Sequence, residues 1–265
     1  MNTATRLRAV ILDWAGTTVD HGSIAPVIAL QTLFAKHDIN LSMEDARRDM
    51  GLLKRDHIQA ILRLPNVSER WEGLFGAPPR PDDVTRLFEE FGPLQMNIIA
   101  QHSQVIDGVV ETTRNWQSRG LLIGSTTGYT RAMLDPVQEQ AAAAGYVPNA
   151  TVCPDEVGSG RPAPWMLARN LQMLNVYPPI ACVKIGDTIS DIEEGLNAGV
   201  WTIGLTRTGN MIGLDAAGFA GLPATEKTSL LQKAEADFLS AGAHYVAEDL
   251  SACNGILEEI QARIK

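Results

Sequence analysis

Three segments of the chain carry residue types that could transfer a phosphoryl group. Asp13 directly follows the apolar run Ala9–Leu12, and its carboxylate could attack phosphorus to form an aspartyl-phosphate. Hydroxyl residues and glycines at positions 124–129 could donate O–H and backbone N–H groups to a phosphate. Arg161 precedes a predicted helix and could bind phosphoryl oxygens with two donors at once. All three segments therefore suit chemistry at phosphorus.

A fourth segment, Lys184–Asp191, carries two carboxylates at a predicted strand-to-helix junction. Asp187 ends the strand, and Asp191 lies one turn into the helix that follows. Hard cations such as Mg²⁺ prefer oxygen ligands, so this pair predicts a metal site. Each of the four segments also has an ordinary structural alternative. These are a strand-end carboxylate, a Ser/Thr/Gly turn, a solvated arginine and an acid favoured by a helix dipole.

The elements that must position these residues alternate between apolar runs and helical patterns. This alternation predicts an α/β fold with a parallel sheet wrapped by helices. Strands are expected at residues 9–12, 121–123, 151–153, 181–183, 200–203 and 244–246. Helices are expected near 108–119, 130–144, 164–175 and 191–198, and on both sides of the last strand. Ligands bind beyond the carboxyl ends of strands in such sheets, so the fold would gather the polar segments at one edge.

Residues 21–103 break the alternation because their patterns are helical alone. Helices are expected there at 25–37, 43–62, 68–75 and 81–100. We interpret this block as a second domain inserted after the first strand. The α/β core would then consist of residues 1–20 and 104–265.

Composition and charge exclude several classes of protein. Lys and Arg number 22 against 31 Asp and Glu, and this net charge of −9 disfavours a nucleic-acid or anionic-membrane partner. The apolar runs are far shorter than the ~18 residues that a membrane span needs, and the N-terminal one is too short for a signal peptide. The three cysteines form no C-x-x-C pair, so Cys153, Cys182 and Cys253 are interpreted as inert thiols. We expect a cytoplasmic protein.

The order and spacing of the four polar segments resemble the four motifs of the haloacid dehalogenase superfamily. The resemblance rests on D-x-x-x-T, a strand-end threonine, an arginine and G-D-x-x-x-D, and it covers the whole chain. It implies a Rossmann-like parallel-sheet core with a mobile helical cap, a nucleophilic Asp13, a phosphate-binding Thr127 and a charge-neutralising Arg161. It also implies Mg²⁺ held by Asp13 and Asp187, with Asp191 holding the waters of the metal or orienting its ligands.

Ala15 stands where most phosphatases of that superfamily carry a second, general-acid aspartate. An alanine side chain transfers no proton, and Ala15 could offer a metal only its backbone carbonyl. General-acid help is typically worth about 10²–10⁴-fold, so the leaving group must depart without it. A carbon leaving group meets this condition when a lysine condenses with an aldehyde beside the P–C bond, because the iminium accepts the electrons.

The helical block holds two lysines, Lys36 and Lys54. On the predicted helix 43–62, Met50, Lys54 and His57 would share one face at spacings of four and three. Nearby arginines could lower the pKa of Lys54 and leave part of it as free amine: Arg47, Arg48 and Arg55. His57 could shuttle protons during imine formation. The alternatives are a solvated lysine and a structural histidine.

A closer resemblance is to the phosphonoacetaldehyde hydrolase (phosphonatase) family. It is carried by D-W-A-G-T-T-V-D, M-G-L-L-K-x-D-H, G-S-T-T-G-Y-T-R, G-R-P-x-P-W-M and G-D-T-x-S-D. It implies hydrolysis of phosphonoacetaldehyde to acetaldehyde and phosphate in 2-aminoethylphosphonate degradation, by a homodimer that joins through its caps. Lys54 would form the Schiff base, and Ser23 replaces a cysteine of some members. Further substrate contacts would come from Met50, His57, Thr127, Gly128 and Tyr129.

Three other functions fit parts of the same pattern. A phosphatase or phosphomutase would need the acid that Ala15 lacks. A dehalogenase also attacks with an aspartate but would not need a metal site at Asp187 and Asp191. A binding protein without catalysis fits poorly, because every polar role has an occupant. Thr126 and Thr127 remain equal candidates for the main phosphate contact.

Overall fold

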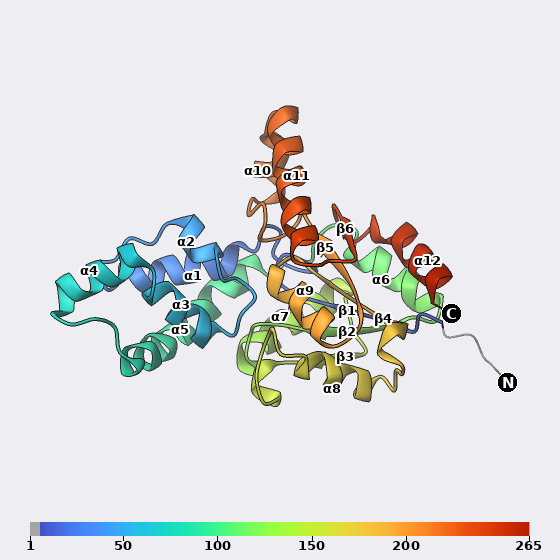
Figure 1. The fold of residues 1–265 in the computed structure, drawn as a ribbon, viewed down its shortest axis with the longest axis horizontal. Helices are drawn as coiled ribbons and strands as arrows, with labels where there is room; N and C mark the ends of the chain where they lie inside the picture. Colours follow the sequence, from blue (N-terminus) through green and yellow to red (C-terminus); the bar gives the residue numbers. More distant parts are fainter. Residues whose placement is uncertain (1–5, 265) are drawn as a thin grey trace.

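The computed structural model describes residues 6–264, and its centre is one six-stranded sheet (Figure 1). All pairings are parallel, and the strand order is β3-β2-β1-β4-β5-β6. The bounds are β1 Ala9–Leu12, β2 Leu122–Thr126, β3 Ala150–Val152, β4 Cys182–Gly186, β5 Trp201–Leu205 and β6 Tyr245–Ala247. The predicted α/β fold with a parallel sheet is confirmed.

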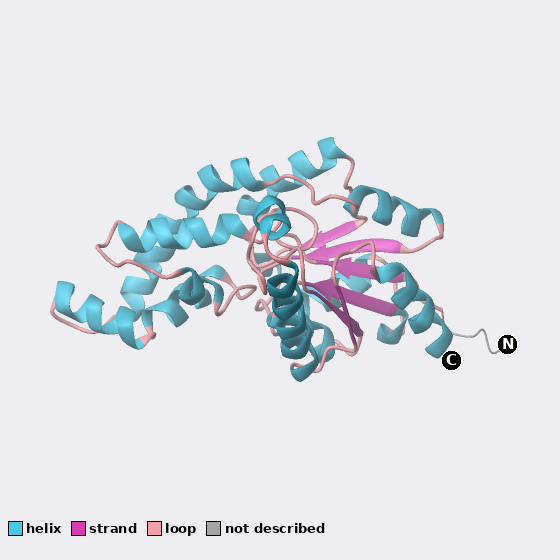
Figure 2. Cartoon of the chain, turned by 90° about the horizontal axis from the view of Figure 1, so that it is seen from above, coloured by secondary structure: helices cyan, strands magenta, loops and turns pink. Residues whose placement is uncertain are grey.

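Helices cover both faces of the sheet, as the view from above shows (Figure 2). The helices of this part are α6 Val109–Ser118, α7 Arg131–Ala144, α8 Trp165–Met173, α9 Ile189–Asn197, α10 Ala216–Gly221, α11 Ala224–Ser240 and α12 Cys253–Arg263. Val10 and Leu12 share a hydrophobic cluster with α6 and α12, whereas Ala9 and Ile11 pack with α8. Successive strand residues point to opposite faces, so β1 must be apolar throughout.

Strand β2 is longer than the sequence predicted. The sequence pattern predicts a turn from Gly124 onward, but Gly124, Ser125 and Thr126 pair with Ala150–Val152 of β3 and extend the strand. A side chain at Gly124 would meet Ile11 and Asn170 of α8 at 2.4 and 2.6 Å. The glycine therefore allows α8 to pack closely, and the turn begins only at Thr127. The short helix α10 was not predicted either.

Of the six helices that lie between β1 and β2 in the described chain, α6 packs with the sheet and the other five group at the left of Figure 1. Their bounds are α1 Ile24–Ala35, α2 Met43–Arg47, α3 Lys54–Leu62, α4 Pro65–Phe75 and α5 Pro81–His102. The two connections to the sheet lie side by side, because Val19 and Val105 form an antiparallel bridge and the Asp20 N–H donates to Gln104 O at 3.1 Å.

The predicted continuous helix 43–62 is wrong, because α2 and α3 are separated by a turn. Gly51 in this turn has φ +94°, a conformation that residues with a side chain rarely adopt. A Cβ there would lie 2.3 Å from Ser190 Oγ and 2.5 Å from Thr188 Oγ1. Met50 therefore lies outside any helix and Lys54 is the first residue of α3. The expected helical face shared by Met50, Lys54 and His57 does not form.

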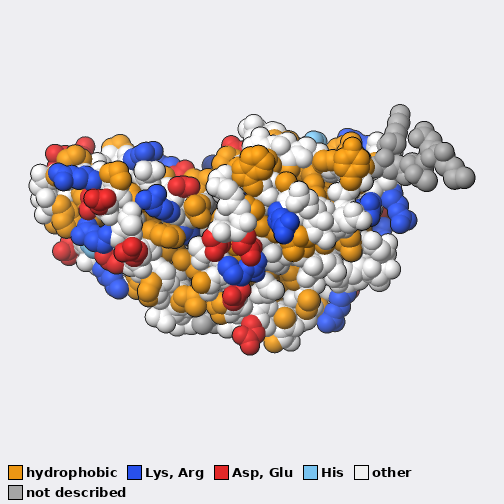
Figure 3. Space-filling view, turned by 90° about the horizontal axis from the view of Figure 1, so that it is seen from below, with side chains coloured by type: hydrophobic (Ala, Val, Ile, Leu, Met, Phe, Trp, Pro, Cys, Tyr) orange, Lys and Arg blue, Asp and Glu red, His pale blue; other side chains and the backbone are white. Residues whose placement is uncertain are grey.

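The surface carries both acidic and basic side chains, as the counts of 22 Lys and Arg and 31 Asp and Glu lead one to expect. Figure 3 shows acidic and basic side chains interspersed on the face it presents. Within residues 6–264, no helix combines the length and apolar character that crossing a membrane requires.

Candidate active site

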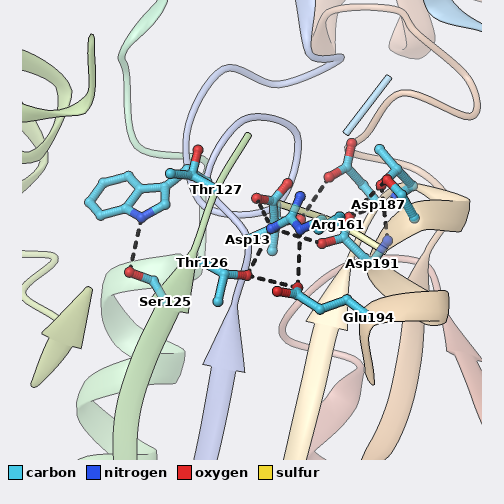
Figure 4. Close-up of polar contacts among 12 residues, drawn as sticks. Asp13, Ser125, Thr126, Thr127, Arg161, Asp187, Asp191 and Glu194 are labelled. Atoms are coloured by element: carbon cyan, nitrogen blue, oxygen red, sulfur yellow. Dashed lines mark hydrogen bonds and ion pairs between the residues drawn. The ribbon is translucent and has the colours of Figure 1, made fainter. Parts of the chain in front are cut away.

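The carboxyl ends of β1, β2 and β4 bring the predicted residues together at one edge of the sheet (Figure 4). The Asp13 N–H donates to Ile185 O at 3.0 Å and so continues the pairing of β1 with β4. Because β1 lies between β2 and β4, Thr127 and Asp187 follow strands on either side of Asp13. The strand order alone therefore places a nucleophile candidate between a hydroxyl group and a second carboxylate.

A cavity of about 20 Å³ lies where this edge meets the helical block. The α/β part contributes Asp13, Ala15, Thr127, Gly128, Tyr129, Arg161 and Thr188 to its wall, and the helical block contributes Ser23, Pro26, Met50, Gly51 and Lys54. Of the predicted site residues, Asp187, Asp191 and His57 do not line the cavity. Asp187 and Asp191 adjoin Asp13, whereas His57 is buried within the helical block.

Three carboxylates could hold a metal ion. Asp13, Asp187 and Asp191 each offer an oxygen, and these oxygens lie within 4.8 Å of one another. Burial raises the pKa of Asp13, which Arg161 opposes with a hydrogen bond of 2.7 Å to Oδ1. Burial, followed by the charges of Asp13 and Asp191, raises the pKa of Asp187 well above its usual value. A divalent cation would relieve this repulsion, and the all-oxygen donor set fits Mg²⁺.

Asp191 differs from the other two carboxylates because the protein already neutralises it. Burial acts to raise its pKa, but Arg161 and Lys184 outweigh this and lower it. Its Oδ1 lies 2.8 Å from Lys184 Nζ and 3.1 Å from Arg161 Nη2, and its Oδ2 accepts from Thr188 Oγ1 at 2.6 Å. Asp13 and Asp187 are therefore the better placed to bind a cation directly.

The three hydroxyl residues after Gly124 have different surroundings. Ser125 Oγ accepts from Trp14 Nε1 at 2.9 Å and contacts Thr151 Oγ1. Thr126 Oγ1 donates to Glu194 and accepts from two buried cations, so its hydroxyl is fully used. Thr127 lines the cavity, and its Oγ1 accepts only the Tyr129 N–H at 3.1 Å within the part of the chain that the structure describes.

Lys54 is buried, and its environment suits a free amine. Its Nζ donates to Met50 Sδ at 3.5 Å and lies 5.8 Å from the centre of the Tyr129 ring. Burial lowers the pKa of Lys54 to about 8, although the Asp13 carboxylate opposes the shift. A lysine with this pKa is partly uncharged near neutral pH, whereas a solvated lysine is almost fully charged.

The expected influence of the neighbouring arginines on Lys54 is wrong. Arg47 turns away and donates to Gly22 O and Gly213 O at 2.8 and 2.9 Å. Arg48 pairs with Asp45 at the surface, and Arg55 is exposed and donates to Thr85. Arg47 and Arg48 at the end of α2 and Arg55 on α3 thus point in different directions. Burial makes the largest contribution to the shift, and the arginine that lowers the pKa of Lys54 is Arg161 of the α/β part.

His57 and Tyr129 are both buried near Lys54, and of the two only Tyr129 lines the cavity. Burial, and next the charge of Lys54, lowers the pKa of His57 well below its usual value. The imidazole is therefore neutral at pH 7. Burial, followed by the charges of Asp20 and Asp13, raises the pKa of Tyr129, so its phenol also stays neutral.

Four residues of this site received no role from sequence reasoning, although Thr17 ends the D-x-x-x-T motif. Thr17 Oγ1 and the Asn210 N–H donate to Asp187 at 2.9 and 2.8 Å and hold its carboxylate. Lys184 and Glu194 are completely buried behind Arg161. A sequence signal existed for both, because Lys184 interrupts the apolar run of β4 and Glu194 lies one turn beyond Asp191. No comparable signal marks Asn210, which reaches the site from a distant loop.

Comparison with known proteins agrees with this architecture. Residues 7–199 match the family model described as haloacid dehalogenase-like hydrolase, and residues 158–253 match a second hydrolase model of that type. The chain is 45% identical to the phosphonoacetaldehyde hydrolase of Syntrophobacter fumaroxidans, covering 96% of this chain and 92% of that protein. It is 39% identical to the phosphonoacetaldehyde hydrolase of Bacillus cereus strain G9842, covering 97% of each.

A solved structure resembles the whole molecule. It is described as a phosphonoacetaldehyde hydrolase like protein from Oleispira antarctica, and it superposes with a TM-score of 0.97 at 37% sequence identity. The match covers 98% of this chain and 95% of the other. The similarity thus extends over both the α/β part and the helical block. The chain belongs to the phosphonoacetaldehyde hydrolase family of the haloacid dehalogenase superfamily, and it is a hydrolase.

Proposed function

We propose that the protein hydrolyses the carbon–phosphorus bond of phosphonoacetaldehyde to acetaldehyde and phosphate, as a step of 2-aminoethylphosphonate degradation. The observation that carries this proposal is that Lys54 and Asp13 line one cavity in which Ala15 takes the place of a general acid. An amine and a carboxylate facing one small space suit a substrate with an aldehyde at one end and phosphorus at the other. The names of the relatives point to the same substrate.

The first step is condensation of the aldehyde with Lys54. The uncharged amine adds to the carbonyl carbon, and uptake of one proton from solvent with loss of water leaves a protonated imine. The pKa of about 8 supplies the free amine that this attack needs. His57 is proposed to move protons at this stage, because its neutral imidazole can accept one and it lies one turn of α3 beyond Lys54.

The second step is transfer of the phosphoryl group to Asp13. The carboxylate attacks phosphorus, and the electrons of the P–C bond move into the iminium to form an enamine. No proton is needed by the departing carbon at that moment, which removes the need for an acid at Ala15. Thr127, Gly128 and Arg161 bind the phosphoryl oxygens. Mg²⁺ bound by Asp13, Asp187 and the carbonyl of Ala15, with Asp191 supporting its ligands, would neutralise charge on those oxygens.

The last steps release both products. Water hydrolyses the aspartyl-phosphate to phosphate and restores Asp13. The enamine takes up a proton at carbon to become an imine, which water hydrolyses to acetaldehyde and free Lys54. Met50 and Tyr129 border the amine, and their apolar surfaces exclude solvent while the imine exists.

Substrate entry requires the helical block to move. A cavity of about 20 Å³ holds little more than one water molecule. We propose that residues 21–103 act as a cap on the core formed by residues 1–20 and 104–265. The paired connections at Val19 and Val105 are the place where such a motion would be absorbed. Closure then brings Lys54 to Asp13 and expels water.

The proposed function is tested by incubating the protein with phosphonoacetaldehyde and Mg²⁺ and measuring acetaldehyde and phosphate together. Equal release of both products is expected. Phosphate released from ordinary phosphomonoesters, with none from the phosphonate, would instead establish a phosphatase.

Imine formation is expected to rise with pH and to level off above about 8. The amine reacts only when uncharged, so below its pKa of about 8 the rate increases about tenfold per pH unit. The measurement is the rate at which acetaldehyde plus borohydride modifies Lys54 across a pH series. A rise centred near 10.5, the ordinary value for lysine, would contradict the role of burial.

Removal of divalent metal is expected to stop phosphate release while leaving imine formation intact. Loss of the cation restores the repulsion among Asp13, Asp187 and Asp191, and the rate should fall about 10²-fold or more. Phosphate is measured after dialysis against EDTA and again after Mg²⁺ is added back, with borohydride modification of Lys54 as the internal control. Phosphate release that survives dialysis against EDTA would contradict the role of the metal.

Two further expectations belong to this proposal. One is a homodimer that joins through the caps, which light scattering coupled to size-exclusion chromatography tests. The other is a cytoplasmic location.

A further inference from the structure

A completely buried polar cluster lies behind Arg161, on the side away from the cavity. It consists of Thr126, Lys184 and Glu194, and none of their side chains is exposed to solvent. Thr126 Oγ1 is its centre: the hydroxyl donates to Glu194 Oε2 at 3.0 Å and accepts from Lys184 Nζ at 2.7 Å and Arg161 Nη2 at 2.8 Å. Figure 4 shows Thr126 and Glu194 close to Arg161. Nothing in the proposed reaction uses Lys184 or Glu194.

Glu194 joins the cluster to Arg161. Its Oε2 accepts from Arg161 Nε at 3.0 Å and lies 3.3 Å from Lys184 Nζ. Unpaired buried charges are costly, so each of these groups depends on the others. Lys184 also pairs with Asp191, so the carboxylate of Glu194 is held between two cations and cannot swing away.

The guanidinium of Arg161 is anchored at two of its three nitrogens. Nε binds Glu194, and Nη2 binds Asp13, Thr126 and Asp191. Nη1 is buried and has no hydrogen-bond acceptor among the described residues. Because the guanidinium is planar and rigid, fixing Nε and Nη2 fixes the direction in which Nη1 points. A buried donor without an acceptor, on a residue that lines the cavity, is prepared for an acceptor that a ligand brings.

We propose that Glu194 is a positioning residue that acts through Arg161. It holds Nε, with Lys184 and Thr126 holding Glu194, so that Nη1 stays aimed at an oxygen of the phosphoryl group. This inference rests on the proposed function for the identity of the substrate, but binding of inorganic phosphate tests it without turnover. A glutamate with a structural role alone would affect stability and leave the phosphate affinity of the folded protein unchanged.

The test is calorimetric titration of the full-length protein with inorganic phosphate in the presence of Mg²⁺. Glu194→Gln is expected to weaken phosphate binding about 10- to 100-fold, the scale of a misdirected charge-assisted hydrogen bond. Glu193→Gln is the matched control, because this neighbouring glutamate is exposed, and its affinity should equal that of the wild type. Unchanged affinity in folded Glu194→Gln would overturn the proposal.

The route through Arg161 is tested with a second substitution. Arg161→Lys keeps the charge but loses the planar pair of donors, so it should itself weaken phosphate binding. When Glu194→Gln is added to Arg161→Lys, the phosphate affinity should fall by less than about twofold compared with Arg161→Lys alone. If it weakens binding as much as in the wild type, Glu194 acts independently of Arg161 and the proposal is wrong.

Two further variants cover loss of folding in Glu194→Gln. Glu194→Asp retains the charge and should keep part of the phosphate affinity, and Thr126→Val removes the centre of the cluster without changing charge and should weaken binding. Intact phosphate binding in Thr126→Val would count against the cluster. Borohydride modification of Lys54 by acetaldehyde is expected to persist in all variants. A wild type that binds phosphate but does not hydrolyse phosphonoacetaldehyde would refute the proposed function and leave this inference standing.

Discussion

Substitution of Asp13 by asparagine should abolish phosphate release while leaving imine formation at Lys54 unchanged. An amide cannot accept the phosphoryl group, and kcat should fall about 10⁴-fold or more, the scale seen when a catalytic nucleophile is removed. The fold should survive, because the neutral side chain removes a buried charge that also repels Asp187 and Asp191. The measurements are phosphate release from phosphonoacetaldehyde and the melting temperature of the variant.

Modification of Lys54 is the internal control for Asp13→Asn. If the variant binds and condenses with an aldehyde, acetaldehyde plus borohydride should modify Lys54 as it does in the wild type. Phosphate release within tenfold of the wild type would exclude Asp13 as the nucleophile. Loss of both phosphate release and Lys54 modification in a folded variant would instead show that Asp13 is needed before phosphorus is attacked.

Substitution of Lys54 by arginine should remove the imine route altogether. Arginine keeps the positive charge and most of the length but cannot condense with an aldehyde, so kcat should fall about 10³-fold or more. Acetaldehyde plus borohydride should inactivate the wild type and add one ethyl group to Lys54, which peptide mass spectrometry locates. Neither inactivation nor modification at position 54 is expected in the variant.

Lys36→Arg is the matched control, because Lys36 is the other lysine of the helical block and is exposed. Its activity and its inactivation by borohydride should equal those of the wild type. Full activity of Lys54→Arg would refute the imine mechanism, because the variant cannot form the iminium that accepts the electrons of the P–C bond. If borohydride inactivates the wild type by modifying Lys36, then Lys36 and not Lys54 provides the reactive amine.

The positions of the strands followed from the sequence alone, although β2 and β4 extend beyond the predicted runs. Residues 9–12 and 181–183 form continuous apolar runs because the central strands are covered by helices on both faces, a demand that leaves a clear local pattern. Asp13 follows such a run directly, and Asp187 ends the segment that continues from 181–183, so their place at the sheet edge could be predicted from the sequence. The missing acid at Ala15 could also be recognised from the sequence, because the resemblance supplied the residue expected there.

The break between α2 and α3 could not be deduced from local pattern. Residues 43–62 have a helical period throughout, and a single glycine does not forbid a helix. Gly51 leaves the helical conformation where it packs closely on Thr188 and Ser190, which lie far along the chain. Met50 still contacts Lys54, but it does so from the loop that joins α2 to α3 and not from the same helix.

The ionisation of Lys54 and the aim of Arg161 were decided only by the tertiary structure. Periodicity and capping act over a few residues, so they place a side chain on an element but say nothing of its depth or its distant neighbours. Burial, which lowers the pKa of Lys54, arises when the helical block packs on the sheet edge. The pairing of Glu194 with Arg161 likewise joins residues from separate elements. Local sequence pattern was thus enough to identify Asp13, Lys54 and Asp187, whereas long-range packing set their ionisation and brought Lys184, Glu194 and Asn210 beside them.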